Sequence, residues 1–166
     1  YLSSGGFYSE DNKHLGLFVA DSQILSESTQ SSLLNGYFSI KKSGVVDISA
    51  NIPEVPVYAI QSGPILIFES KTQLLTLQRD EKARRIIVAI TKSDDVVFMA
   101  IYEAKSPIFG PELKELPEIL DEIQRNTSLK FDAALNLDGG SHSAFITDIV
   151  SLTEIAPIGS YFCVNP

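Results

Sequence analysis

The sequence predicts an α+β fold, in which a twisted, largely antiparallel multi-stranded sheet carries one main helix packed on it. Most apolar segments are short and rich in Val, Ile, Phe and Tyr, as strands are. One segment, within residues 110–126, instead repeats its leucines and isoleucines at helical spacing. The resulting order of many strands, one helix and further strands is typical of α+β domains.

Seven segments before the helix are predicted to be strands, because they are rich in β-branched or aromatic residues and are bounded by turn residues. They cover residues 15–20, 36–41, 45–49, 56–60, 64–70, 85–91 and 95–102. The last two flank the turn-rich sequence KSDD, which predicts a β-hairpin. The continuous apolar run IIVAI within 85–91 indicates a strand that is covered on both faces.

The helix is predicted from four apolar residues that share one face at spacings of three or four: Leu113, Leu116, Leu120 and Ile123. Pro117 fits a first helical turn but not a helix interior, so the helix either begins near Glu115 or is kinked there. Residues 129–137 then return as a strand. Three further short strands are expected in SAFITD, SLTEIA and SYFCV.

Length and composition limit the possible classes of protein. The 166 residues, 44% of them hydrophobic, suit one domain over residues 1–166. A net charge of -8 argues against a nucleic-acid partner, because such proteins need a basic face. No apolar run approaches the ~20 residues that a membrane span requires. The single cysteine, Cys163, cannot form an internal disulfide and is expected to be a small apolar residue of the last strand.

Three glycine-containing corners interrupt the strands. We call SSGGFY (3–8) the first corner, IQSGPIL (60–66) the second and NLDGGSHS (136–143) the third. Glycine lets a backbone or a ligand approach closely, and successive amides can form an anion-binding nest. Each corner is alternatively only a turn. If they serve one site, the three corners must converge on one cleft.

The role of Asp138 in the third corner has two interpretations, and the residues alone do not decide between them. It ends an apolar strand and precedes Gly139 and Gly140. Its side chain either caps an Asx turn or projects as a carboxylate beside a glycine-lined cavity.

The motifs and their order resemble the phosphodiester glycosidases, the family of the mannose 6-phosphate uncovering enzyme. The family pattern is an Asn-Gly-Gly-Phe-Phe corner, a Gln-Ser-Gly-Pro strand start, an Arg-Thr strand, a helix and a strand ending in Asn-Leu-Asp-Gly-Gly. This chain has, in order, SGGFY, QSGPILI, RIIVAIT, GPELKELPEIL and ALNLDGG. It differs at Ser4, Ile86 and Ala89, where the family has Asn, Thr and Gly. We also expect it to lack the strands that family members place before the first corner.

The resemblance implies a hydrolase that cleaves the glycosidic bond of a sugar-1-phosphodiester and releases free sugar and a phosphomonoester. Its partner would be a small-molecule sugar phosphodiester or a glycan, in a secreted, periplasmic or lumenal compartment. Arg85 matches the family arginine and offers a planar donor fork to phosphate. Asp138 would supply the carboxylate at the anomeric carbon. His142 is either a second acid/base or a surface histidine.

Further residues are candidates for substrate binding: Gly5, Gly6, Gln61, Ser62, Gly63, Asn136, Gly139, Gly140 and Ser141. The glycine amides at the first and third corners would donate to an anion. Gln61 and Ser62 would orient sugar hydroxyls or, alternatively, satisfy backbone groups at the strand edge. Arg84 is expected to be solvated on the opposite strand face from Arg85. His14 and the acidic pair Glu10 and Asp11 are expected in a surface loop.

No cofactor and no metal site is predicted, because the chain has no spaced set of His, Cys and Asp ligands. The rival to the enzyme is a non-catalytic carbohydrate- or phosphate-binding domain that retains the Gly-rich pocket. Ser4 and Ile86 favour this rival, whereas Asp138, Arg85 and the three corners favour the enzyme. A third possibility is a structural β domain whose glycines only turn corners.

Overall fold

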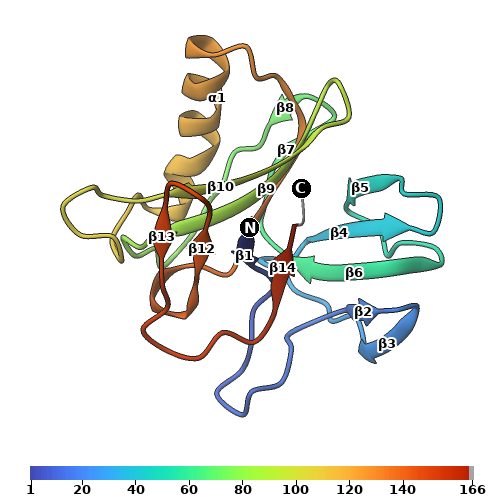
Figure 1. Cartoon of the computed structure of the whole chain (residues 1–166). Helices are drawn as coiled ribbons and strands as arrows, with labels where there is room; N and C mark the ends of the chain where they lie inside the picture. The colour runs from blue at the N-terminus through green and yellow to red at the C-terminus, as the bar shows by residue number, and fades with distance from the viewer. Residues whose placement is uncertain (165–166) are drawn as a thin grey trace.

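The computed structural model describes residues 1–164 and contains three β-sheets and one main helix (Figure 1). All strand pairs in this range are antiparallel, as predicted. The strands form two five-stranded sheets and one four-stranded sheet, where we expected a single sheet. The expectation of one sheet was wrong because a sequence pattern marks strands but not which strands pair.

The central sheet has the strand order β10-β9-β11-β7-β8. Its strands are β7 (Ile65–Phe68), β8 (Lys71–Thr72), β9 (Arg85–Thr91), β10 (Val96–Ile101) and β11 (Phe131–Leu137). The predicted hairpin is confirmed, because β9 and β10 pair from Arg85–Ile101 to Ile90–Val96. The two-residue strand β8 was not predicted, since Lys and Thr carry little strand signal.

The central sheet is covered on both faces, as the apolar run in β9 predicts. Ile86, Val88 and Ile90 point into a core shared with the second five-stranded sheet. Ile87 and Ala89 point into a second core under the helix. Because neighbouring residues of a strand face opposite sides, both halves of the run are buried.

Helix α1 (Leu116–Asn126) packs on the central sheet through the buried side chains of Leu116 and Leu120. A 3-10 turn at Leu113–Glu115 precedes it, so Pro117 lies in the first turn of α1. Of the two alternatives, the structure therefore shows a helix that begins after Glu115 rather than a kinked one.

The second five-stranded sheet has the order β3-β2-β6-β4-β5. Its strands are β2 (Phe18–Ala20), β3 (Gln23–Ser26), β4 (Gly36–Lys41), β5 (Val46–Ser49) and β6 (Pro56–Ser62). Strand β3 was missed because its Ile24 and Leu25 are both exposed and give no alternating pattern.

The small sheet brings the two ends of the chain together (Figure 1). Its order is β13-β12-β1-β14, with β1 (Leu2–Ser4), β12 (Phe145–Ile146), β13 (Ser151–Leu152) and β14 (Tyr161–Cys163). Phe162 of β14 packs its ring 5.3 Å from that of Phe38, which closes one end of the first core. Cys163 lies in the last strand as predicted, but its side chain is exposed.

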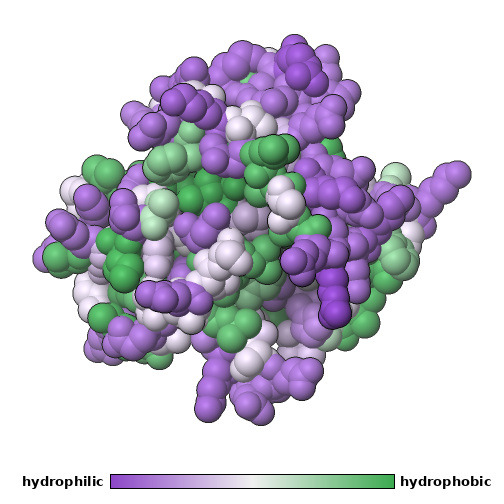
Figure 2. All heavy atoms as spheres, turned by 180° about the vertical axis from the view of Figure 1, so that it is seen from behind, coloured by the Kyte–Doolittle hydropathy of each residue, from purple (hydrophilic) through white to green (hydrophobic). Residues whose placement is uncertain are grey.

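Hydrophilic residues dominate the face seen in Figure 2, and hydrophobic ones gather in a band across its middle. No helix in residues 1–164 is long and apolar enough to cross a membrane. The same residues contain no group of three or more His, Cys, Asp or Glu side chains placed to hold a metal ion.

Candidate active site at the end of strand β11

The three corners meet around the C-terminal end of β11. The amide of Asp138 donates to the carbonyl oxygen of Gly5 at 2.9 Å, which joins the third corner to the first. The hydroxyl of Ser62 and the amide of Gly63 donate to the carbonyl oxygen of Asn136 at 2.7 and 3.1 Å, which joins the third corner to the second. Segments far apart in the sequence are therefore adjacent here, as expected if they serve one site.

Asp138 forms part of the wall of two hollows. The first, which we call the Tyr8 hollow, has a volume of about 420 Å³ and is lined by Tyr8, Ser9, Glu10, Asn12, Asp138, His142, Pro157 and Gly159. The second, the Arg85 hollow, has a volume of about 250 Å³. Asp138 lines it together with Arg79, Asp80, Arg85 and Asn136. A residue that borders both spaces can contact two parts of one ligand.

Burial raises the pKa of Asp138 from its ordinary value of 3.8 to about 7. The nearby backbone amide of Gly139 opposes this shift, because it stabilises the charged form. The carboxyl therefore loses its proton at a much higher pH than an ordinary aspartate does. A pKa close to neutral pH suits a general acid or base better than the low pKa of an ordinary surface aspartate.

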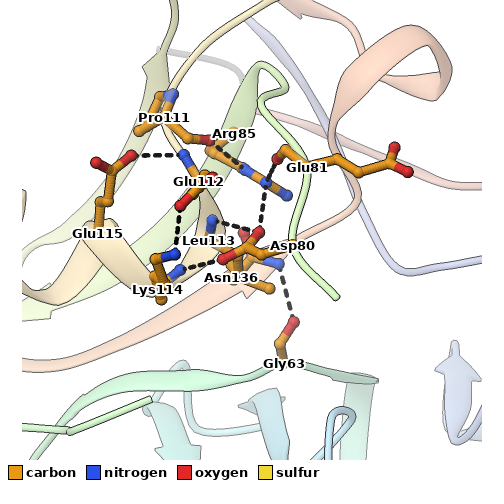
Figure 3. Close-up of polar contacts among 10 residues, drawn as sticks. All are labelled: Gly63, Asp80, Glu81, Arg85, Pro111, Glu112, Leu113, Lys114, Glu115 and Asn136. Carbon is orange, nitrogen blue, oxygen red and sulfur yellow. Dashed lines mark hydrogen bonds and ion pairs between the residues drawn. The ribbon is translucent and has the colours of Figure 1, made fainter. Parts of the chain in front are cut away.

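Arg85 lines its hollow but is already tied to the protein (Figure 3). It pairs with the carboxylate of Asp80 at 3.3 Å, and its Nε donates to the carbonyl oxygen of Pro111 at 3.1 Å. Its Nη2 also contacts the carbonyl oxygen of Glu81. No acceptor within residues 1–164 bonds to Nη1. Two of the five guanidinium N–H donors therefore remain for a ligand.

Asp80 connects Arg85 to the start of the helical segment. Its carboxylate accepts the amides of Leu113 and Lys114, each at 2.8 Å, as well as the guanidinium (Figure 3). These amides would otherwise lack partners at the start of the 3-10 turn. The role of Asp80 was not predicted, because it lies in a polar segment with no periodic pattern.

Asn136 supplies an unpaired acceptor next to Asp138. It is only 2% exposed, and its Nδ2 donates to the carbonyl oxygen of Gly63 at 2.8 Å (Figure 3). Its Oδ1 is buried and has no hydrogen-bond partner within the described residues. Buried polar atoms are nearly always paired, so this atom is a candidate contact for a ligand donor in the Arg85 hollow.

The amides of Gly5, Gly6 and Gly140 have protein acceptors, where we expected free donors for an anion. Gly5 and Gly6 donate at 2.9 Å to the carbonyl and hydroxyl oxygens of Ser160, and Gly140 donates at 2.8 Å to the carbonyl of Arg84. The glycines are needed instead for close approach. A Cβ added at Gly139 would lie 2.4 Å from the carbonyl oxygen of Arg84.

Gln61 and Ser62 satisfy backbone groups, which was the alternative to contact with sugar. The Oε1 of Gln61 accepts the amides of Leu17 and Thr29 at 3.1 and 3.0 Å. Its Nε2 donates to the carbonyl oxygens of Thr29 and Leu34 at 2.7 and 2.8 Å. Both side chains are almost fully buried, and neither lines the Tyr8 or Arg85 hollow.

The last three residues of the third corner are polar, and of these only His142 is exposed. His142 is exposed and lines the Tyr8 hollow, with its Nδ1 3.2 Å from the hydroxyl of Ser141. The histidine therefore lines the same hollow as Asp138 and is also open to solvent. It combines features of the two predicted roles, a second acid/base and a surface histidine.

Two expectations about charged residues were wrong. Arg84 is 1% exposed rather than solvated, because its side chain turns inward and its Nε donates to the hydroxyl of Ser143 at 2.9 Å. His14 is partly buried rather than in an open loop, with its ring 4.8 Å from Phe18 and 5.0 Å from Tyr8. Hydrogen-bond acceptors in the third corner hold Arg84 inside, and ring contacts with Phe18 and Tyr8 partly bury His14. Glu10 and Asp11 are exposed, as expected.

The residues that differ from the family pattern lie inside the protein. Ser4 is 1% exposed, and its hydroxyl accepts the amide of Ala144 at 2.6 Å. Ile86 is fully buried in the first core. Neither residue lines the Tyr8 or Arg85 hollow.

Other wall residues carry only weak sequence signals. A Cβ on Gly159 would lie 1.9 Å from the ring of Tyr8, so the sequence GSY forms a fourth tight approach beside the first corner. Its glycine and serine resemble those of the other corners, and this is the one signal that points to it.

Comparison with known proteins gives a family match and similar solved structures. The family model for phosphodiester glycosidases matches residues 2–164. No curated protein matches the sequence. One similar solved structure is the zebrafish N-acetylglucosamine-1-phosphodiester alpha-N-acetylglucosaminidase catalytic domain, with 18% identity and a TM-score of 0.66. Another is a hypothetical protein from Synechocystis, with 13% identity and a TM-score of 0.62.

Each structural match covers 92% of this chain, but only 54% of the zebrafish chain and 48% of the Synechocystis chain. The chain thus spans about half the length of these solved structures. At such low identity, the structural matches show only a shared fold. The family match, in contrast, extends over nearly the whole sequence. The chain belongs to the phosphodiester glycosidase family.

Proposed function

We propose that this chain is a hydrolase that cleaves the glycosidic bond of a sugar-1-phosphodiester and releases free sugar and a phosphomonoester. The observation that carries the proposal is the desolvated carboxyl of Asp138 on the wall common to two hollows, one of which contains Arg85. Family membership supports a glycosidase of this class.

The two hollows suit the two halves of such a substrate. The phosphodiester would lie in the Arg85 hollow, where Nη1 of Arg85 can donate to a phosphate oxygen. The sugar would lie in the Tyr8 hollow, where Ser9, Asn12 and Glu10 offer polar partners for hydroxyl groups. The anomeric carbon would then be next to Asp138, where the two spaces meet.

Asp138 would act in its ionised form, either activating water or attacking the anomeric carbon. The bond between that carbon and the phosphate oxygen breaks, and the phosphate leaves with the electron pair. Water supplies the new hydroxyl of the sugar, and its proton passes to Asp138 or to solvent. A phosphomonoester is a weak base, so its departure needs less acid assistance than departure of an alcohol. His142 lines the same hollow and is placed to exchange protons with solvent.

A panel of sugar-1-phosphodiesters tests the proposal, with release of free sugar as the signal. Cleavage of at least one member by the parent, abolished by Asp138→Asn, would support the enzyme. Binding of sugar phosphates without any cleavage would instead support the rival, a carbohydrate- or phosphate-binding domain. The rival is retained because Ser4 and Ile86 stand where the family pattern has Asn and Thr.

A further inference from the structure

Arg84 is a buried cation without an ion-pair partner. Its side chain is 1% exposed, and neither of the two salt bridges found within residues 1–164 involves it. Burial lowers its pKa, while the more distant charge of Glu154 raises it. An unpaired buried charge is costly, so the guanidinium must be stabilised by hydrogen bonds.

Those hydrogen bonds converge on the third corner and the segment behind it. Nε donates to the hydroxyl of Ser143 at 2.9 Å, and Nη2 donates to the carbonyl oxygen of Gly140 at 3.2 Å. Nη2 also donates to the carbonyl oxygens of Ser143 and Thr153, the latter at 3.1 Å. One remaining bond, from Nη1 to the carbonyl of Pro107, is long at 3.4 Å.

The backbone of Arg84 holds the same corner from the other side. Its carbonyl oxygen accepts the amide of Gly140 at 2.8 Å, so one residue bonds both to the amide and to the carbonyl of Gly140. Gly139 contacts that carbonyl so closely that a Cβ would lie 2.4 Å from it. The peptide that follows Asp138 is therefore fixed between strand β11 and Arg84.

This arrangement bears directly on the candidate catalytic carboxyl. The nearby amide of Gly139 lowers the pKa of the Asp138 carboxyl, and the next residue, Gly140, is hydrogen-bonded to Arg84 through both its amide and its carbonyl group. We propose that Arg84 is a positioning residue, which holds the Gly139–Gly140 turn so that the Asp138 carboxyl stays at the wall between the two hollows. The proposal rests on the proposed function for its catalytic meaning, but its geometry can be tested without activity.

The test compares Arg84→Lys with the parent, because lysine keeps the charge but loses the planar fork. The ionisation midpoint of Asp138 is followed by NMR of its carbon-13-labelled carboxyl group. With the turn loosened, the Gly139 amide stabilises the carboxylate less, so we expect the midpoint to rise by about half a pH unit or more. Other titratable or charged side chains line the hollows and are recorded as background: Tyr8, Glu10, His142, Arg79, Asp80, Glu81 and Arg85.

Activity gives the second readout. A misplaced carboxyl should lower kcat by ~10- to 100-fold with little change in KM. Leu120→Ala is the control, because it removes a fully buried side chain under α1 and destabilises the fold without touching the third corner. A purely structural role for Arg84 would make both variants alike, with an unchanged Asp138 midpoint and an unchanged kcat per folded molecule. That result would overturn the proposal.

Ser143→Ala provides a milder variant if Arg84→Lys does not fold. It removes the acceptor of Nε and the bond from the Ser143 hydroxyl to the carbonyl of Gly140. We expect a smaller rise of the Asp138 midpoint, and no rise would count against the proposal. A parent that cleaves nothing while its Asp138 midpoint still moves in the variants would refute the proposed function and leave the positioning role standing.

Discussion

The amide of Asp138 donates a 2.9 Å hydrogen bond to the carbonyl oxygen of Gly5, near the opposite end of the chain. Strand β1 ends at Ser4 and β11 ends at Leu137, so the bond joins the first residues beyond two strands of different sheets. The carboxyl of Asp138 is thereby held on rigid elements rather than on a free loop. Binding and catalytic residues are often placed in this way, on a connecting segment that a rigid scaffold positions.

Replacing Asp138 with asparagine should abolish turnover while preserving shape. We expect kcat to fall by at least ~100-fold, because a positioned acid/base group is lost while the side chain keeps its size. Rates measured on a sugar-1-phosphodiester, with circular dichroism as the folding check, give the answer. Equal rates in the two proteins would remove Asp138 from the chemistry.

The same substitution should stabilise the protein at alkaline pH. The pKa of Asp138 is about 7 when folded and near 3.8 otherwise, so the folded state binds the extra proton between these values. Stability contributed by this group is therefore lost as pH rises toward 7, and the ionised form is the costly one. In calorimetry, Asp138→Asn should raise the Tm at about pH 8 and raise it less at about pH 5. A variant that melts lower at both pH values would show that Asp138 mainly supports the turn.

The pH dependence of activity follows from the same group. If Asp138 acts as base or nucleophile, it must be ionised, so kcat/KM should rise as pH increases through about 7. A profile measured over the neutral range checks this. A rate that falls through this range would assign Asp138 the role of a general acid instead.

Arg85→Ala should weaken binding of a sugar-1-phosphodiester by roughly 1.5–3 kcal/mol, the range for hydrogen bonds to charged groups. The change also leaves the carboxylate of Asp80 without its cation, which adds repulsion toward phosphate. Isothermal calorimetry measures the loss, with Arg125→Ala on the exposed side of α1 as the charge-matched control. Equal affinities of the two variants would mean that Arg85 only anchors the segment around Asp80.

His14 should make the protein less stable in acid. Burial lowers its pKa below the ordinary 6.5, and its Nε2 is buried without a partner within residues 1–164. The unfolded state therefore binds a proton more readily, and stability is lost as pH falls below about 6.5. His14→Phe keeps the ring contacts with Phe18 and Tyr8 and removes the titration. Its unfolding free energy should fall less than that of the parent between about pH 6.5 and 5, and parallel curves would contradict this account.

Local patterns predicted much of the fold. The apolar run in β9 predicted a strand buried on both faces, and the spacing of Leu116 and Leu120 predicted α1. Strands β3 and β8, of four and two residues, were missed because neither has a recognisable strand pattern. The division of the strands into three sheets depends on which distant segments pair, and a local sequence pattern does not predict that.

For the site, the motifs identified the corners and Asp138 but not the partners of each group. The inward turn of Arg84 depends on acceptors at Gly140 and Ser143, and the pairing of Arg85 with Asp80 depends on how a polar segment folds back. Both are tertiary effects. Two neighbouring arginines with nearly the same sequence context therefore serve different parts of the structure.

The most direct test of the central claim is hydrolysis of a sugar-1-phosphodiester in water enriched in oxygen-18, with both products analysed by mass spectrometry. Attack at the anomeric carbon, beside Asp138, places the label in the free sugar and leaves the phosphomonoester unlabelled. This is the result we predict. Label in the phosphomonoester would mean that water attacks phosphorus and that the phosphorus–oxygen bond breaks, which would contradict the assignment of this site as a glycosidase.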